Sequence, residues 1–242
     1  RTLNEEKYIG LCLSRVFSQK TDVPYEVIIV DSGSTDRTVE IARQFPTRFI
    51  TIPRSEFTYG RALNRGCAAA KGIYCVFLSA HAIPATECWL AELLSGFDDR
   101  TAATFGSQIA LPEANPLARR MILVSWPPLR WKNKYMIWET PFNNTNCAIR
   151  KDLWMTTPFD ELVCASEDSL WARQMLQQGH RLAFCSDARV HHSHNDTLSQ
   201  FHRRYSREFR VAFDNNPRLR TFRNYSLVSV YTCLRDVHHL LD

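Results

Sequence analysis

The sequence predicts an α/β fold in three layers, with helices on both faces of a mostly parallel sheet. Apolar runs of strand length alternate with segments in which apolar residues recur at helical spacing. The runs are nearly unbroken, as in strands buried on both faces, and their alternation with helices implies parallel neighbours. The chain has 242 residues, 45% of them hydrophobic, which suits one domain with an elaborated end.

The first expected element is a helix that Asn4 caps and that extends to Phe17. An α/β fold normally begins with a strand, so we expect that strand to be missing from this sequence. Further strands are expected at 25–30, 48–53, 73–78 and 101–108. Between them, residues 31–45 are expected to turn and enter a helix capped by Ser34 or Thr35, and further helices are expected at 59–72 and 86–97.

Charge and composition exclude several classes of protein. The net charge of +5 is too small to indicate a nucleic-acid partner. The sequence contains no apolar run of about 18 residues, so no membrane-spanning helix is predicted. The eight cysteines form no C-x-x-C pair and lie mostly in apolar surroundings, which predicts reduced thiols and a cytoplasmic protein.

Two polar stretches follow predicted strands, where ligands bind in sheets of this kind. In the first, Asp31 can accept hydrogen bonds from a base or ribose, Ser32 follows it, and Gly33 lets the backbone approach a ligand. In the alternative interpretation, these residues only satisfy the backbone amides of a turn. The second stretch, Ser79 to His81, places a serine and a histidine at the end of a strand without a carboxylate.

Seven segments occur in order along the chain: "RTLNEEKYIG", "VIIVDSGSTDRTVEIA", "FTYGRALNRGCAAAKG", "VFLSAHAIP", "FNNTNCAIRKDLW", "PFDELVCASEDSLWARQMLQQGHRLAF" and "ARVHHSHNDT". Together they resemble a bacterial family 2 glycosyltransferase with the GT-A fold, over residues 1 to about 210. Within that family, the segment "DSGSTD" most resembles that of rhamnosyl-type enzymes.

The resemblance implies an inverting enzyme that moves a sugar from a nucleotide-sugar donor to a hydroxyl of a saccharide or lipid-linked acceptor. It also implies a role in surface polysaccharide biosynthesis. The protein is then expected in the cytoplasm, either free or at the inner face of the membrane. Two alternatives stay open: a catalytically silent module that binds nucleotide sugars or glycans, and a nucleotidyltransferase of related topology. The nucleotidyltransferase alternative lacks support, because no Gly-rich, Lys- or Arg-bearing loop follows the first predicted strand.

In the family, the strand that "VFL" resembles usually ends in Asp-x-Asp, which holds a divalent cation on the donor diphosphate. Here Ser79 and His81 replace the two acids, as in a sub-branch of the family. In one interpretation His81 binds Mn²⁺ or Mg²⁺, together with His192 and His194 of "VHHSH". Imidazole favours Mn²⁺ over Mg²⁺. In a second, His81 and arginines hold the diphosphate without a metal. In a third, the histidines are only hydrogen-bonded in a wall.

Glu167 and Asp168 open a predicted helix, where the helix dipole alone would favour acids. The pair resembles the family's Glu-Asp motif, in which the aspartate is the general base. An inverting transfer needs one carboxylate to take the proton of the acceptor hydroxyl. The resemblance therefore assigns that role to Asp168, with Glu167 orienting the acceptor or the neighbouring backbone.

Five further residues are weaker candidates. Arg61 and Asn64 lie at a helix start that could meet the donor, although Arg61 could equally form a surface ion pair. Asn144 and Asn146 could hydrogen-bond sugar hydroxyls, although asparagine also serves turns. Trp171 is a candidate sugar platform, but its helical spacing favours the core.

We expect the GT-A domain to occupy residues 1–198. Within it, residues 109–141 mix aromatic and basic residues in a long connection, which suggests an acceptor-side insertion or contact with a membrane surface. Residues 199–242 are expected to form a helical extension whose arginines surround an aromatic face. The sequence does not indicate the oligomeric state.

Overall fold

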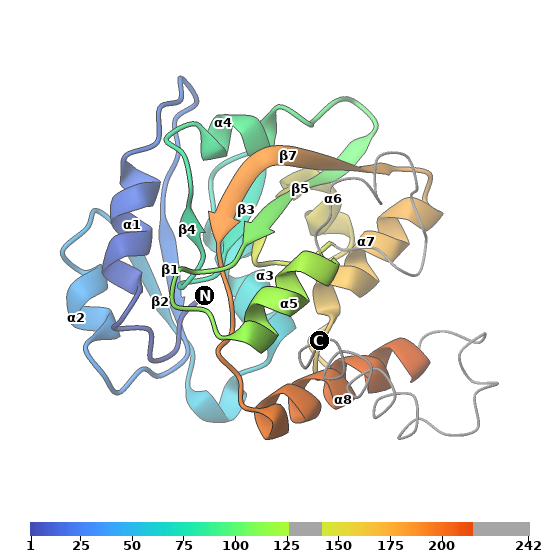
Figure 1. The fold of residues 1–242 in the computed structure, drawn as a ribbon. Coiled ribbons are helices and arrows are strands. Elements are labelled where there is room, and N and C mark those ends of the chain that lie inside the picture. The colour runs from blue at the N-terminus through green and yellow to red at the C-terminus, as the bar shows by residue number, and fades with distance from the viewer. Residues whose placement is uncertain (126–141, 215–242) are drawn as a thin grey trace.

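The computed structural model describes residues 1–125 and 142–214 (Figure 1). Its strands form a five-stranded sheet in the order β3-β6-β5-β7-β4 and a separate parallel pair, β1-β2. The larger sheet comprises β3 (Tyr74–Leu78), β4 (Ile83–Pro84), β5 (Thr101–Ile109), β6 (Asn146–Arg150) and β7 (Arg181–His191). The pair comprises β1 (Ile28–Asp31) and β2 (Arg48–Thr51).

The α/β prediction is confirmed, but the prediction of a mostly parallel sheet is wrong. In the five-stranded sheet only β5 and β7 pair in parallel, while β6 runs antiparallel to both β3 and β5, and β4 runs antiparallel to β7. For two of these three antiparallel pairings the reason is the position of β6, which follows residues 109–141 in the chain and inserts between two earlier strands. The βαβ rhythm of the first half could not reveal an insertion made by the second half.

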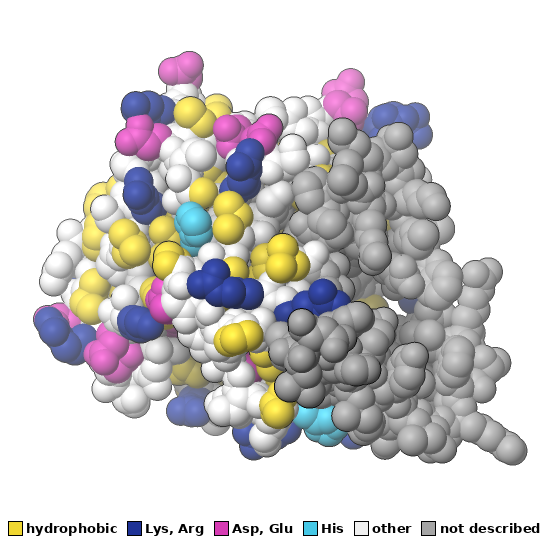
Figure 2. All heavy atoms as spheres, in the orientation of Figure 1, with side chains coloured by type: hydrophobic (Ala, Val, Ile, Leu, Met, Phe, Trp, Pro, Cys, Tyr) yellow, Lys and Arg dark blue, Asp and Glu magenta, His cyan; other side chains and the backbone are white. Residues whose placement is uncertain are grey.

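Helices lie around the sheets (Figure 1). They are α1 (Ile9–Phe17), α2 (Thr38–Ala42), α3 (Tyr59–Ala69), α4 (Trp89–Leu94), α5 (Pro116–Ser125), α6 (Lys151–Thr156), α7 (Glu167–Gln177) and α8 (Leu198–Asp214), with a 3₁₀ turn at Arg54–Glu56. Among these described helices, none combines the length and apolar character needed to cross a bilayer. Figure 2 shows basic and acidic side chains interspersed on the face around α1 and α2.

The prediction that Asn4 caps the first helix is wrong. Asn4 has a positive φ of 53°, and α1 begins only at Ile9. Its side-chain oxygen instead accepts a hydrogen bond from the backbone N–H of Thr35, and its own N–H donates to Ser34 Oγ. Asparagine tolerates this left-handed conformation better than most residues. The segment before α1 is thereby fastened to the loop that follows β1.

The main core cluster joins α3, α7 and the large sheet. Trp171 of α7 is 1% exposed and packs near Phe142 and Phe159, with ring centroids 6.4 and 5.8 Å away. Its indole Nε1 donates to the carbonyl of Thr157. The core alternative for Trp171 is therefore what the structure shows.

The pairing of strands near the C-terminal end of β7 positions the site. Ile83 of β4 and Ile109 of β5 both lie opposite His191, on the two sides of β7. The N–H of His192 also donates to the carbonyl of Ile109. As a result, His81 just before β4 and Gln108 of β5 meet the residues that follow β7. The division of the chain at residue 198 stays a prediction.

Candidate active site

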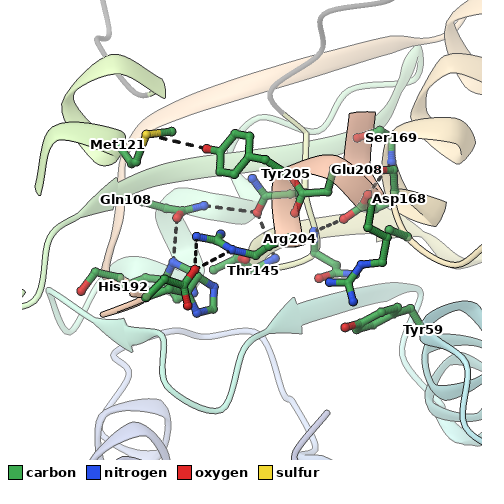
Figure 3. A pocket seen from close by; sticks show the side chains of 18 of the residues that line it. Tyr59, Gln108, Met121, Thr145, Asp168, Ser169, His192, Arg204, Tyr205 and Glu208 are labelled. Carbon is green, nitrogen blue, oxygen red and sulfur yellow. Dashed lines mark hydrogen bonds and ion pairs between the residues drawn. The ribbon is translucent and has the colours of Figure 1, made fainter. Parts of the chain in front are cut away.

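A cavity of about 570 Å³ opens beyond the end of β7. Its walls come from α5, the loop 142–145, the start of α7, the residues after β7, and one face of α8. Figure 3 shows Asp168 and His192 on opposite sides of the cavity in this view, with Arg204 of α8 between them. The predicted acid pair and two of the predicted histidines thus share one cavity.

Asp168 and Glu167 lie at the first turn of α7, and both are buried. The backbone N–H of Asn144 donates to Asp168 Oδ2 at 2.8 Å, and that of Ser169 donates to Oδ1 at 2.7 Å. The Asn144 side chain donates to Glu167 Oε1 at 2.8 Å. Ser166, just before the pair, has a left-handed φ of 60°, a conformation that non-glycine residues adopt mainly where the surroundings impose it.

Burial raises the pKa of both Glu167 and Asp168. The pKa of Glu167 rises from 4.5 to about 7, first because the side chain is removed from water and second because Asp168 is negatively charged. Burial also raises the pKa of Asp168, against the hydrogen bonds from Asn144 and Ser169 that favour its charged form. Removal from water therefore disfavours the charged form of both carboxyls, and a pair of acids perturbed in this way inside a cavity marks a candidate catalytic site.

His81, His192 and His194 converge at the other side of the site. Their potential ligand nitrogens all lie within 4.8 Å of one another. The rings of His81 and His192 stack at 4.8 Å between centroids, and their Nε2 atoms are 3.1 Å apart. Burial lowers the pKa of His192 well below its usual value, and burial together with Arg204 lowers that of His194 to about 4.

Two side chains from distant parts of the chain hold the outer nitrogens of this cluster. His81 Nδ1 lies 2.7 Å from Glu5 Oε1, and because an ionised carboxylate only accepts, the imidazole donates. His192 Nδ1 lies 2.9 Å from Gln108 Oε1. The amide of Gln108 donates from its nitrogen to Asn143, which leaves its oxygen facing the histidine.

This donor set fits a divalent cation. For zinc, whose bonds to histidine nitrogens are about 2.0–2.1 Å long, two ligand nitrogens lie about 2.8–3.4 Å apart for bond angles between 90° and tetrahedral. The 3.1 Å between the two Nε2 atoms falls within that range. Three imidazoles suit manganese and later transition metals better than Mg²⁺, which prefers oxygen ligands.

Helix α8 adds charged groups to the cavity. Arg204 forms a two-point ion pair with Asp196, at 2.9 and 2.6 Å. Glu208, one turn further along, also lines the cavity, and burial raises its pKa. Arg207 lies 5.6 Å from the ring of Tyr59, whose ring also lies 4.4 Å from the guanidinium of Arg1. Cations and carboxylates therefore face the same space, as binding of a polar, charged ligand requires.

Several predicted site residues lie outside this cavity. Asp31 is buried and accepts hydrogen bonds from the N–H groups of Gly33 and Ser34 and from Ser34 Oγ, as in the turn interpretation. Gly33 has a φ of 87°, which explains a glycine there. Ser32 is buried beside them. Ser79 lies next to the histidine cluster, with its Oγ 3.4 Å from His81 Nδ1.

Arg61 and Asn64 connect α3 to the segment before α7. Arg61 Nε pairs with Glu161 at 2.9 Å. Asn64 accepts from the indole of Trp154 and donates to the carbonyl of Phe159. Neither residue is among those that line the cavity.

Of the two predicted asparagines, the structure brings only Asn144 to the cavity. Asn146 is 1% exposed, donates to the carbonyls of Ser107 and Ala188, and accepts from the indole of Trp89. It therefore joins β5, β6, β7 and α4 inside the core.

Sequence reasoning missed the residues that support the site rather than form it. Glu5 and Gln108 hold the histidines, and Glu208 enters the cavity from α8. The arginines of α8 carried a signal, since they surround an aromatic face. Glu5 and Gln108 carried none, because 76 and 84 residues separate them from their partners.

The protein is an α/β protein with a mixed sheet flanked by helices and a polar cavity beyond the end of β7. The chain belongs to glycosyl transferase family 2, whose family model matches residues 2–154. It is 36% identical over 198 residues to the O-antigen chain rhamnosyltransferase WbaN of Salmonella anatum, covering 78% of this chain. It is 32% identical over 199 residues to RfbN, the O-antigen chain rhamnosyltransferase of Salmonella typhimurium, covering 77% of this chain. The chain spans 63% of the length of each of these two relatives.

A solved structure shares the fold. The mannosyltransferase PcManGT from Pyrobaculum calidifontis, in complex with GDP-Man and Mn²⁺, matches with a TM-score of 0.65 at 20% identity. The match covers 99% of this chain and 72% of that one. The expected family and the expected GT-A fold are therefore confirmed.

Proposed function

We propose that the protein transfers a sugar from a nucleotide-sugar donor to a hydroxyl of a saccharide or lipid-linked acceptor, with inversion at the anomeric carbon. The single observation that carries this proposal is the cavity that joins the buried acid pair of α7 to the histidine cluster. The acid pair offers a proton acceptor, and the histidine cluster offers ligands for a cation that would bind the donor's diphosphate.

Asp168 acts as the general base. Its carboxylate takes the proton of the acceptor hydroxyl while the hydroxyl oxygen attacks the anomeric carbon. The bond from that carbon to the diphosphate breaks, and the nucleoside diphosphate leaves with the electron pair. The two backbone N–H groups of Asn144 and Ser169 fix the carboxylate at the helix start and still leave lone pairs on both oxygens. Glu167, held by the Asn144 amide, orients the acceptor.

His81, His192 and His194 would hold a divalent cation, for which Mn²⁺ is the better fit. A cation bound there would offset the negative charge that develops on the departing diphosphate. Arg204 lies beside His194 and adds a fixed positive charge on the same side of the cavity.

The names of two relatives support a proposal for the acceptor and the cellular setting. Two of them are named as O-antigen chain rhamnosyltransferases, which favours a rhamnosyl or similar donor and a growing surface polysaccharide as acceptor. We place the protein in the cytoplasm, with a peripheral contact at the inner face of the membrane. Residues 109–141 are the proposed acceptor-side element, of which α5 lines the cavity and 126–141 lie outside the described residues.

The test is release of nucleoside diphosphate from a panel of nucleotide sugars, with and without saccharide acceptors, by the full chain. The proposal predicts release with at least one donor and loss of release in Asp168→Asn. Binding of a nucleotide sugar without turnover would favour the silent module instead.

A further inference from the structure

We propose that Glu5 is a positioning residue for the cation site: it fixes the imidazole of His81 so that Nε2, and not Nδ1, faces the cation. This inference rests on the proposed function, since it concerns the same site. Glu5 belongs to the segment before α1, and nothing in its spacing connects it to residue 81.

The geometry of the contact supports a directed role. The 2.7 Å distance from Glu5 Oε1 to His81 Nδ1 is that of a charge-assisted hydrogen bond. The two side chains are only 21% and 16% exposed, so water competes little for either partner. With Nδ1–H donated to the carboxylate, a neutral His81 carries its lone pair on Nε2, which lies 3.1 Å from His192 Nε2.

The same arrangement occurs on the neighbouring ligand. Gln108 Oε1 holds His192 Nδ1 at 2.9 Å, so both rings are turned with Nε2 toward one point. In metal sites, ligating histidines characteristically donate their other N–H to a carboxylate or carbonyl, which fixes the tautomer and raises the basicity of the ligand. Of the two partners, only Glu5 carries a charge, so it has the larger effect on basicity.

The segment that carries Glu5 is itself held in place. The backbone N–H of Glu5 donates to Thr38 Oγ1 at 2.6 Å. Asn4 is bonded to Ser34 and Thr35 on one side of it, and the backbone N–H of Glu6 donates to Asp36 Oδ2 on the other, a bond that does not depend on the Glu6 side chain. The "DSGSTDRT" stretch after β1 therefore anchors the segment from which Glu5 reaches His81. The stretch therefore has two structural roles: it forms the local turn at Asp31, and it holds the segment that carries Glu5.

The adjacent glutamates allow a matched test. Glu5→Ala removes the one side-chain contact described for Glu5, whereas Glu6→Ala alters an exposed neighbour that does not touch the histidines. Binding of Mn²⁺ alone is measured by the loss of the free-ion EPR signal, and binding of Co²⁺ alone by its visible absorption. Loss of a second-shell partner typically weakens metal binding about 10–100-fold.

We expect Glu5→Ala to weaken Mn²⁺ binding by that factor and Glu6→Ala to match the wild type. Glu5→Gln should lose less Mn²⁺ affinity than Glu5→Ala, because its amide oxygen can still accept a hydrogen bond from Nδ1–H of His81. A second measurement needs no metal: the imidazole ¹⁵N shifts should show Nδ1–H on His81 in the wild type and a redistributed proton in Glu5→Ala.

Equal Mn²⁺ affinity of Glu5→Ala and wild type, with unchanged ¹⁵N shifts, would overturn the role of Glu5 and leave the cation site intact. A wild-type protein that binds neither Mn²⁺ nor Co²⁺ would overturn the cation site of the proposed function itself. If Glu5→Ala does not fold, Glu5→Gln and the ¹⁵N shifts decide the same question.

Discussion

Replacing Glu167 with glutamine should stabilise the protein, and only above the pH at which the free carboxyl ionises. The folded protein holds the pKa of Glu167 at about 7, above its ordinary value of 4.5, because the side chain is buried beside Asp168. Folding therefore favours the protonated form. Below about pH 4.5 the carboxyl is protonated in both states and imposes no penalty. The penalty grows as the pH rises and is complete above about pH 7.

The size of the effect follows from the same values. Each tenfold change in acidity corresponds to about 1.4 kcal/mol, so the rise from 4.5 to about 7 corresponds to about 3 kcal/mol. Glutamine keeps the shape and can still accept from the Asn144 amide, but carries no charge. Each kcal/mol shifts Tm by about 2–4 °C in a chain of this length, so Glu167→Gln should melt roughly 6–12 °C higher at about pH 8.

The assay is thermal and urea unfolding of both proteins between about pH 4 and pH 8. The difference between them should vanish at the acid end and grow toward neutral pH. Glu161→Gln is the control of opposite sign, because hydrogen bonds from Asn64 and Arg61 lower the pKa of Glu161. Its loss of stability should be present at neutral pH and fade as the pH falls. If Glu167→Gln is no more stable than wild type at about pH 8, the electrostatic account of the acid pair is wrong.

Three further predictions concern the general base, a buried asparagine and the close approach of β5 and β7. Asp168→Asn should lower the rate of sugar transfer by about 10²–10⁴ while nucleoside diphosphates still raise Tm, and a rate close to wild type would remove Asp168 as the base. Asn146→Ala leaves the indole of Trp89 without its buried acceptor and should cost roughly 3 kcal/mol in urea unfolding. Gly106→Ala should destabilise the protein strongly, since a Cβ would lie 1.9 Å from the carbonyl oxygen of Ala188, whereas Gly66→Ala, which meets only a Val30 methyl group at 3.4 Å, should not. Equal stability of the two alanine variants would contradict the close approach of β5 and β7.

The sequence was most informative where the signal is local. Unbroken apolar runs placed β1, β3 and β5 within a few residues, and the acids at the start of α7 were identified as a pair. The direction of β6 could not be predicted, because it depends on where the chain returns after a long connection. Sequence spacing alone also misjudged Asn4, whose side chain caps a loop rather than a helix.

The same difference holds for the residues of the candidate site: some were found from the sequence, and others depend on how the strands pair. The resemblance located His81, His192 and His194 as a set, and the structure brings them together. Asn146 shows the limit of residue type as a guide. An asparagine near a predicted site was interpreted as a sugar contact, yet its three partners lie on β5, β7 and α4. Such partners, like Glu5 for His81, become visible only once the strands are paired.

The proposed binding of a nucleoside diphosphate and a cation is tested most directly by the Tm of the full chain with a panel of nucleoside diphosphates, in Mn²⁺, in Mg²⁺ and in chelator. A ligand that binds only the folded state must raise Tm by mass action. We expect at least one nucleoside diphosphate to raise Tm in Mn²⁺ and to raise it less in Mg²⁺. We also expect His192→Ala to remove the difference between metal and chelator. Equal stabilisation in chelator would assign the diphosphate to the arginines, and no stabilisation by any nucleotide would contradict the transferase proposal.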